Sequence, residues 1–430
     1  MAPAHDPPRA SRSHELAIRD VAVIADDLTG AADCGIAFAV AGLPTFVTFG
    51  EKPAPDSARI VAIDTDSRWR SETEAKQRAL EAARGAYREG TRTIYKKIDS
   101  TLRGHVGAEL AATFQAASER RSGAVPIVLL APAFPAMGRM TRGGRILVGG
   151  VPLEETEVWR KSGMSGPADP VPLLRQAGLR AAAIDLARVR SGAEPLAESM
   201  ADEMVQAAVC DAEVEDDLRR VAEAGARLRR PVVWAGSGGL ARHLPAALGL
   251  EPDPAQKAPP LDRASGPVLM LVGSRSQEAH EQARFVAAQP GVRIFELAPD
   301  QLLLGERSPA ASQLERALAE RTDVVLVISL GERVDLSLAA SLAAALARLA
   351  AGQASRIGGL VATGGDIARA ALAALGAAGL HLLGEVEPGV PIGLADTHPA
   401  LPVVTKAGAF GTPPTLQRSR AALKRLYGGS

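Results

Sequence analysis

Two neighbouring acids follow the first predicted strand of this 430-residue chain, in the segment IADDLTGAAD at residues 24–33. A carboxylate at the end of a buried strand is costly unless it binds a cation, a hydroxyl group or the N–H groups of a helix. Capping of the following helix accounts for one of the acids, since Asp is a preferred N-cap residue. Because the second acid stays unexplained, we interpret Asp26 and Asp27 as candidate functional residues.

A denser polar cluster follows a later strand, in the segment YKKIDSTLRGHVGAEL at residues 95–110. Its side chains combine cations, hydroxyls and a carboxylate: Lys96, Lys97, Asp99, Ser100, Thr101 and Arg103. Gly104 then opens a predicted helix, whose first N–H groups add further donors. The whole cluster suits a ligand that carries a carboxylate or a phosphate, whereas a single lysine would indicate only a solvated turn.

Two further segments are less distinctive when each is taken alone. Ser67 and Arg68 end the segment DTDSR, which fits a ligand contact and a helix cap with a surface arginine equally well. The segment at residues 131–156 contains three arginines with prolines and glycines around them. We predict an ordered loop over a binding site there, with a purely structural hairpin as the alternative.

Glycine-rich segments follow three strands in the second half: VGSRS at 272–276, TGGDIA at 363–368 and KAGAFG at 406–411. Glycine lets a backbone approach a ligand closely, and a helix N-terminus supplies N–H donors and a positive dipole. One such segment would indicate only a turn, but three on one sheet predict a phosphate-rich ligand such as a nucleotide. Asp366 is available for a magnesium-bound water and Lys406 for a phosphate, unless both lie at the surface.

Composition excludes several classes of protein. Lysine and arginine together number 49, as do aspartate and glutamate, so the net charge is zero and no nucleic-acid partner is expected. Cys34 and Cys210 are the only cysteines, which excludes a disulfide framework and a Cys-rich metal site. No apolar run reaches the ~18–20 residues that cross a bilayer, so no membrane partner is expected. We interpret residues 1–18 as a disordered leader and expect a cytoplasmic protein.

Hydrophobic runs of strand length alternate with stretches of helical period, a pattern typical of an α/β protein with parallel sheets. The predicted strands are 21–26, 44–50, 59–64, 91–98, 124–132, 231–236, 267–273, 292–297, 323–329, 359–364 and 401–406. The proline-rich segment 251–266 interrupts this alternation and divides the chain into domains at 19–250 and 267–430. We therefore expect two α/β domains with mainly parallel sheets, with a ligand cleft between them that closes about the linker.

Two other classes of nucleotide-dependent enzyme have recognisable motifs. No G-x-x-x-x-G-K-[ST] sequence occurs, which excludes a P-loop enzyme. GSGGLA at residues 236–241 matches a loose dinucleotide-binding pattern, but the proline-rich segment occupies the place of the acidic residue expected about 20 residues later. We interpret GSGGLA as a tight turn between a strand and a helix and keep a nicotinamide-dependent oxidoreductase as an alternative.

The order of these motifs resembles that of the four-carbon acid sugar kinases. IADDLTGAAD, DTDSR, KKIDSTLRGHVGAEL and PAFPAMGR are similar to motifs of the family's N-terminal domain, and VGSRS, TGGDIA and KAGAFG to loops of its C-terminal domain. The resemblance covers nearly the whole chain. It implies an ATP-dependent kinase of a small sugar acid such as threonate, erythronate or 3-oxo-tetronate, whose first domain binds the acid and whose second domain binds ATP with Mg²⁺.

The resemblance also implies roles for individual residues. The implied sugar-acid site comprises Asp26, Asp27, Ser67, Arg68, Lys97, Asp99, Ser100 and Arg103. The implied ATP site comprises Ser274, Gly364, Gly365, Asp366, Ile367, Gly408 and Gly411. Four residues depart from the family pattern, where asparagine or a hydroxyl residue is usual: His105, Met140, Ile367 and Ala407. Because two of these changes fall in the ATP loops, an inactive sugar-acid-binding protein is a second alternative.

For the reaction we expect the cations of the first domain to hold the carboxylate and hydroxyls of the substrate: Arg68, Lys97 and Arg103. One carboxylate would accept the proton of the terminal hydroxyl, with Asp27 favoured over Asp26 and Asp99. Magnesium would bridge the ATP phosphates mainly through water, with Asp366 as its one candidate contact, also through water. The sequence leaves open whether the protein forms a homo-oligomer.

Overall fold

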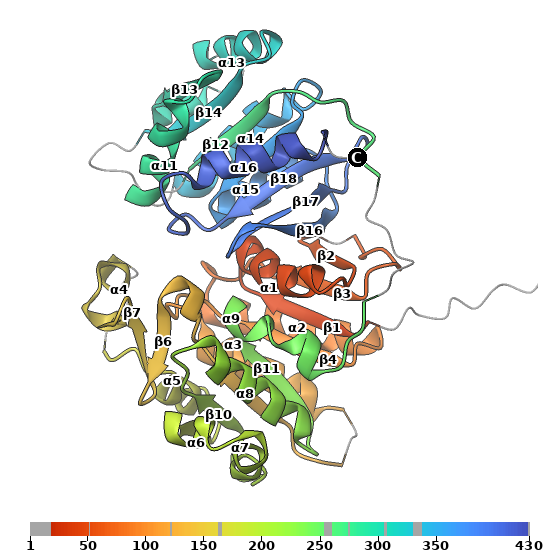
Figure 1. Cartoon of the computed structure of the whole chain (residues 1–430), viewed down its shortest axis with the longest axis vertical. Coiled ribbons are helices and arrows are strands. Elements are labelled where there is room, and N and C mark those ends of the chain that lie inside the picture. The colour runs from red at the N-terminus through yellow and green to blue at the C-terminus, as the bar shows by residue number, and fades with distance from the viewer. Residues whose placement is uncertain are drawn as a thin grey trace, which may run out of the picture.

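The computed structural model describes residues 19–50, 52–120, 123–161, 166–252, 260–273, 276–304, 308–329 and 338–428. The predicted leader at 1–18, the middle of the predicted linker at 253–259 and Ser274 lie outside the described residues. The structure is α/β, with helices on both faces of a long sheet (Figure 1). The predicted fold class is therefore confirmed.

The first half contributes parallel strands to this sheet, and all of them except the edge strand β9 are short runs of mainly buried side chains. Their bounds are β1 Val21–Ala25, β2 Thr45–Thr48, β3 Ile60–Asp64, β4 Thr93–Lys97, β5 Ile127–Ala131, β9 Ala181–Ile184, β10 Ala207–Cys210 and β11 Val232–Gly236. The order across this half is β2-β3-β1-β4-β11-β5-β10-β9. Strands β9 and β10 were not predicted, because both are rich in alanine, a residue with little preference for strands.

The second half contributes a second block of parallel strands, followed by two antiparallel strands. The bounds are β12 Val268–Val272, β13 Val292–Leu297, β14 Asp323–Ile328, β15 Gly359–Thr363, β16 Gly379–Glu387, β17 Val390–Ala395 and β18 Leu401–Lys406. The order across this half is β13-β14-β12-β15-β18-β17-β16.

The two halves share one 15-stranded sheet, because β16 pairs antiparallel with β2, with Leu380 opposite Val47. The sequence predicted a separate sheet for each domain, and this difference has a local cause. Glycines and prolines interrupt the segment that forms β16 and β17, and they usually indicate turns. The register shifts between Leu382 and Gly384 confirm an irregular strand there.

The arginine- and glycine-rich segment after β5 forms a small antiparallel sheet of its own. Its strands are β6 Arg139–Arg142, β7 Arg145–Val148 and β8 Val151–Pro152, with the short 3₁₀ helices η1 Pro135–Met137 and η2 Leu153–Glu155 at its ends. Arg142 pairs with Glu213 and Arg145 with Glu154. These two arginines therefore support the structural alternative for this segment.

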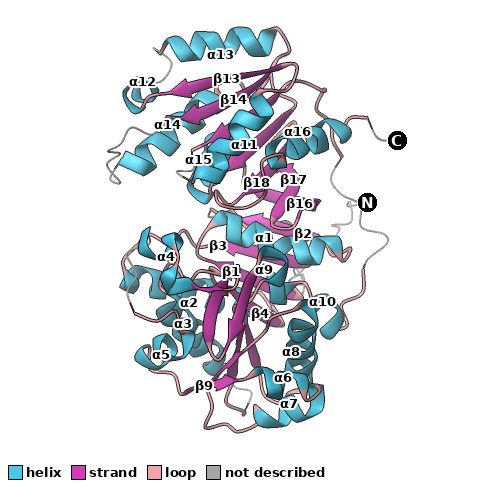
Figure 2. Cartoon of the chain, turned by 60° about the vertical axis from the view of Figure 1, so that its left-hand side comes forward, coloured by secondary structure: helices cyan, strands magenta, loops and turns pink. Residues whose placement is uncertain are grey.

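Helices cover both faces of the long sheet, as Figure 2 shows. In the first half they are α1 Leu28–Val40, α2 Glu72–Arg88, α3 Val106–Ser118, α4 Glu157–Lys161, α5 Pro170–Gln176, α6 Leu186–Arg190, α7 Ala193–Ser199, α8 Glu215–Arg227, α9 Gly238–Ala241 and α10 Leu244–Ala247. In the second half they are α11 Gln277–Ala287, α12 Pro299–Leu303, α13 Pro309–Ala319, α14 Ala339–Ala351, α15 Gly365–Ala374 and α16 Thr415–Arg425. The Ala-rich helix predicted at 337–352 is α14. In the part of the chain that the structure describes, no helix is long and apolar enough to cross a membrane.

Helix α1 lies at the junction of the two halves and contacts α9, α15 and β16. Its small residues permit this close packing: a methyl group added at Gly35 would lie 2.9 Å from Leu382 of β16 and 3.2 Å from Thr45 of β2. One apolar cluster, which includes Ile36, runs through this junction from the first half into the second. The N-terminus of α1 is therefore held next to both halves of the molecule.

Candidate active site

Arg68 joins the acids at the end of β1. Its Nε and Nη2 donate to Asp26 at 2.7 and 2.8 Å, and its Nη1 and Nη2 donate to Asp27 at 2.7 and 2.9 Å. Strands β1 and β3 pair in parallel, so the loops that follow them lie side by side. Burial opposes the charge of Asp26, but Arg68, together with Lys96 and Lys97, lowers the pKa of Asp26 below its usual range. The same acids raise the pKa of Arg68 in spite of its burial.

A second carboxylate–arginine pair follows β4. Arg103 donates to Asp99 through Nε and Nη2, both at 2.8 Å, and Asp99 also accepts from the hydroxyl and the N–H of Thr101. Burial opposes the charge of Asp99, but Arg103, together with Arg68 and Lys97, holds the pKa of Asp99 well below its usual range. The backbone is strained in both loops, since Asp66 and Leu102 have φ of 49° and 58°. Such strain is concentrated at functional sites.

Lys97 is the cation of this cluster that the protein leaves without a partner. It is 5% exposed, and no hydrogen bond or ion pair joins its ammonium group to another described residue. Burial works against its charge, but Cys34, Asp33 and Asp27 around it raise the pKa of Lys97 overall. A methyl group at Gly30 would lie 2.9 Å from its Nζ. A buried ammonium group that keeps its charge and lacks a hydrogen bond to the described residues is suited to bind an anionic ligand.

Two polar residues of the predicted segments, Ser67 and Lys96, have partners within the protein. The fully buried Ser67 hydroxyl donates to Glu109 at 2.5 Å, and Glu109 pairs with Lys96 at 3.1 Å. Ser67 therefore supports the loop that carries Arg68, and its role as a direct substrate ligand stays a prediction. Ser100 is also buried, next to Asp99 in the chain.

The glycine-rich N-terminus of α15 meets the acids of the first half. A methyl group at Gly365 would lie 2.8 Å from Asp27 Oδ2 and 3.4 Å from the Thr29 hydroxyl. Gly364, which precedes it, has a φ of 102° that favours glycine. Burial, with Asp27 as the nearest contributing charge, raises the pKa of Asp366. The structure thus brings the predicted sugar-acid residues and one predicted ATP loop together.

The other two predicted ATP loops are joined at one carbonyl. The Gly408 carbonyl accepts from the Ser276 hydroxyl at 2.9 Å and from Lys406 Nζ at 3.1 Å. Lys406 is fully buried, and burial lowers its pKa to about 7. The φ of Gly411 is 87°, another position that favours glycine. Lys406 is therefore an internal support of this loop rather than a surface residue.

The Ile367 side chain does not line this site. It is 5% exposed and packs in the apolar core, next to Gly273 of the VGSRS segment. His105, another departure from the family pattern, reaches the backbone carbonyl of Arg70 at 2.7 Å. These two residues therefore fill structural positions.

Two residues of the site were not singled out from the sequence. Asp33 is a buried acid in the middle of α1, and its position among small and apolar residues was an available signal. Arg139 is half-buried beside the pair formed by Asp99 and Arg103, where burial lowers its pKa, and its Nε has no hydrogen-bond partner among the described residues. Arg139 is one of the three arginines of the segment at residues 131–156, and only the structure separates it from Arg142, which pairs with Glu213.

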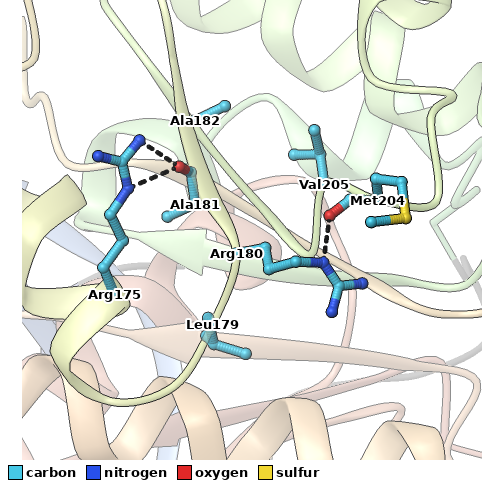
Figure 3. Close-up of a pocket in the computed structure, with 7 residues that line it drawn as sticks. All are labelled: Arg175, Leu179, Arg180, Ala181, Ala182, Met204 and Val205. Carbon is cyan, nitrogen blue, oxygen red and sulfur yellow. Dashed lines mark hydrogen bonds between the residues drawn. The ribbon is translucent and has the colours of Figure 1, made fainter.

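A pocket of about 390 Å³ lies elsewhere, beside the edge strand β9 (Figure 3). Both arginines that line it donate to backbone carbonyls: Arg175 to Ala181 at 2.9 and 3.1 Å, and Arg180 to Met204 at 2.6 Å. Three strands, β11, β5 and β10, separate β9 from β4, so this pocket is remote from the paired acids and arginines. We assign it no part in the site.

Solved structures share the fold of this chain. A Salmonella typhimurium LT2 protein superposes with a TM-score of 0.77 at 22% identity and covers 93% of this chain and 98% of its own. A Haemophilus influenzae protein superposes with a TM-score of 0.69 at 22% identity and covers 94% and 100%.

Sequence comparisons extend the likeness from fold to family. A model described as a sugar-binding N-terminal domain matches residues 21–244, and one described as a nucleotide-binding C-terminal domain matches residues 269–416. A D-threonate kinase of Cupriavidus necator is 42% identical and covers 93% of this chain and 97% of its own. A D-erythronate kinase of Heliobacterium modesticaldum is 30% identical and covers 91% and 94%. The chain therefore belongs to the four-carbon acid sugar kinase family, as a kinase that phosphorylates a sugar acid.

Proposed function

We propose that this kinase transfers the γ-phosphoryl group of ATP to the terminal hydroxyl of D-threonate, with Mg²⁺, in the cytoplasm. One contact carries this proposal: Asp27, which follows β1 in the sugar-acid half, meets the N-terminus of α15 at Gly365. A phosphoryl acceptor and a nucleotide must come this close for direct transfer. The choice of D-threonate is supported by relatives of that name at 42% and 33% identity.

The sugar acid has a binding site of matching chemistry in the first half. Lys97 is a buried cation with no hydrogen bond or ion pair to any residue that the structure describes, and Arg103 and Arg139 lie beside Asp99. Together they would bind the substrate carboxylate, since charge-assisted hydrogen bonds to carboxylates are the strong ones. Arg68 is fully engaged with Asp26 and Asp27, so we assign it the positioning of those acids.

The nucleotide would lie against the glycine loops of the second half, where N–H groups and a helix N-terminus face the phosphates. Mg²⁺ neutralises charge on the transferred phosphoryl group when it is bound with ATP. Asp366 fits a water-mediated contact to that ion, because no hydrogen bond or ion pair engages its carboxylate within the described part of the chain. Among those residues no group of three or more His, Cys, Asp or Glu side chains could hold a metal ion directly.

We further propose that residues 19–250 and 267–430 act as the two domains, with 251–266 as the linker. The described ends of this linker are anchored, since Arg59 donates to the Glu251 carbonyl at 2.6 Å and Arg263 to the Ala354 carbonyl at 2.7 Å.

A coupled assay of ADP release with ATP and Mg²⁺ tests the function. The substrates are D- and L-threonate, D- and L-erythronate and their 3-oxo forms. We expect the highest kcat/KM with D-threonate. A preference for another acid would overturn the choice of substrate, and silence with every acid, together with no effect of ATP on the melting temperature, would favour an inactive sugar-acid-binding protein.

A further inference from the structure

Asp33 is a buried carboxylate for which the protein provides no hydrogen bond. It is 6% exposed, and none of its contacts with described residues is a hydrogen bond or an ion pair. Its Oδ1 is fully buried and has no partner. An unpaired carboxylate in the interior is destabilising, so its presence indicates a role other than stability.

The groups around Asp33 come from both halves of the molecule. The opposite charges that act on it most strongly are Lys97 of β4 and Arg242 after α9, while Glu385 of β16 and Asp27 repel it. Arg242 and Glu385 pair with each other across the junction at 2.7 and 2.9 Å. The Arg242 Nε is itself buried without a partner. Asp33 and Lys97 are thus two opposite charges, both buried and both left without an ion pair.

Asp33 also faces the last glycine-rich loop of the nucleotide half. A methyl group at Gly389, in the turn between β16 and β17, would lie 3.6 Å from Asp33 Oδ1 and 2.6 Å from the Phe410 ring. Phe410 lies between Gly408 and Gly411 in the segment KAGAFG. Helix α1 therefore presents one acid, Asp27, to the loop at Gly365 and another, Asp33, to the turn at Gly389, which Phe410 also adjoins.

Asp27 is poorly suited to accept a proton, because its oxygens already accept several hydrogen bonds. Oδ1 accepts from the Gly30 N–H at 2.9 Å and from Arg68, and Oδ2 accepts from the Thr29 hydroxyl at 2.7 Å and from Arg68. Asp33 has no such bonds.

We propose that Asp33 is the catalytic residue that accepts the proton of the substrate hydroxyl, which rests on the proposed kinase function. The hydroxyl oxygen forms a bond to the γ-phosphorus of ATP, and the bond from that phosphorus to the β–γ bridging oxygen breaks with its electron pair left on ADP. The O–H bond of the substrate breaks, and its proton passes to an Asp33 oxygen. Lys97, next to Asp33, binds an anionic group of the same substrate.

The acidity of Asp33 agrees with this role. Burial raises its pKa to about 6, although Lys97 and Arg242 oppose the shift. A general base works best when its pKa lies near the operating pH. Since only the ionised form accepts a proton, kcat/KM of the wild-type enzyme is expected to fall as the pH drops through about 6.

The test compares Asp33→Asn with the wild-type enzyme, using D-threonate, ATP and Mg²⁺. We expect kcat to fall by roughly 100-fold or more, with both KM values nearly unchanged, because general-base catalysis contributes about 10²–10⁴-fold. The melting temperature at pH 8 should not fall, because an unpaired buried charge is removed. In Asp33→Ala, added formate should restore part of kcat, which a structural role would not permit.

Asp27→Asn is the comparison variant. Asparagine can still cap α1, but the charge that pairs with the buried Arg68 is lost, so we expect a lower melting temperature and a higher KM for the acid. If the wild-type enzyme is active and Asp33→Asn keeps most of its kcat, the assignment is overturned. The assignment also fails if Asp33→Asn loses binding of both substrates in a thermal-shift assay. A wild-type enzyme that is silent with every acid overturns the proposed function itself.

Discussion

Adjacent lysines at the end of β4 serve different purposes, because successive side chains of a strand point to opposite faces of the sheet. Lys96 pairs with Glu109 on one face, and Lys97 lies beside Gly30 of α1 on the other. The sequence motif identifies both lysines, and the alternation of side chains along a strand predicts that they lie on opposite faces of the sheet. Which of them lacks a partner depends on Glu109, a residue of another element, and could not be predicted from the motif.

Arg103→Gln tests the sugar-acid site at the level of one side chain. We expect KM for the acid to rise by roughly 10- to 100-fold, the effect of losing a hydrogen bond to a charged group, with KM for ATP unchanged. Steady-state kinetics with each substrate varied in turn measures both. Arg84→Gln is the matched control, because Arg84 also pairs through two nitrogens with a carboxylate, Glu119, but on the surface of α2. Equal effects of the two variants would contradict the assignment of Arg103.

The N-termini of helices α1 and α15 meet at one point, and the strands that precede these helices hold them there. Most of these strands are continuous apolar runs, which is why parallel strands such as β1 and β15 could be predicted. Strands β16 and β17 could not, since Pro388, Gly389 and Pro391 indicate turns by themselves. Their strand structure depends on pairing with β2 and β18, which is a tertiary interaction.

Gly365→Ala tests the contact between these helices. The added methyl group would lie 2.8 Å from Asp27 Oδ2, closer than packing permits, so α15 or Asp27 must move. A small misplacement of reacting groups is enough to reduce kcat/KM for ATP by roughly 10- to 100-fold. Gly85→Ala in α2 is the control, because its nearest neighbour would be 3.9 Å away and the helix should gain stability. Unchanged kinetics of Gly365→Ala would contradict the contact.

Across the whole molecule, the two halves are joined by more than the chain between them. Arg369 of α15 pairs with Asp64 at the end of β3, and Arg242 pairs with Glu385. The alternation of strand-length and helical stretches predicted an α/β protein, and the motifs after the strands predicted a sugar-acid half and a nucleotide half. It could not predict these pairs, since Arg369 and Glu385 lie in no motif and meet their partners only through the shared sheet.

The central claim is that phosphate passes from ATP to the terminal hydroxyl of D-threonate at this junction. The most direct measurement is a ³¹P–¹H correlated NMR spectrum of the product formed from ATP, Mg²⁺ and D-threonate. We predict one new phosphomonoester signal coupled to the two methylene protons of C4. Coupling to the single proton of C2 or C3, or release of inorganic phosphate alone, would contradict the account.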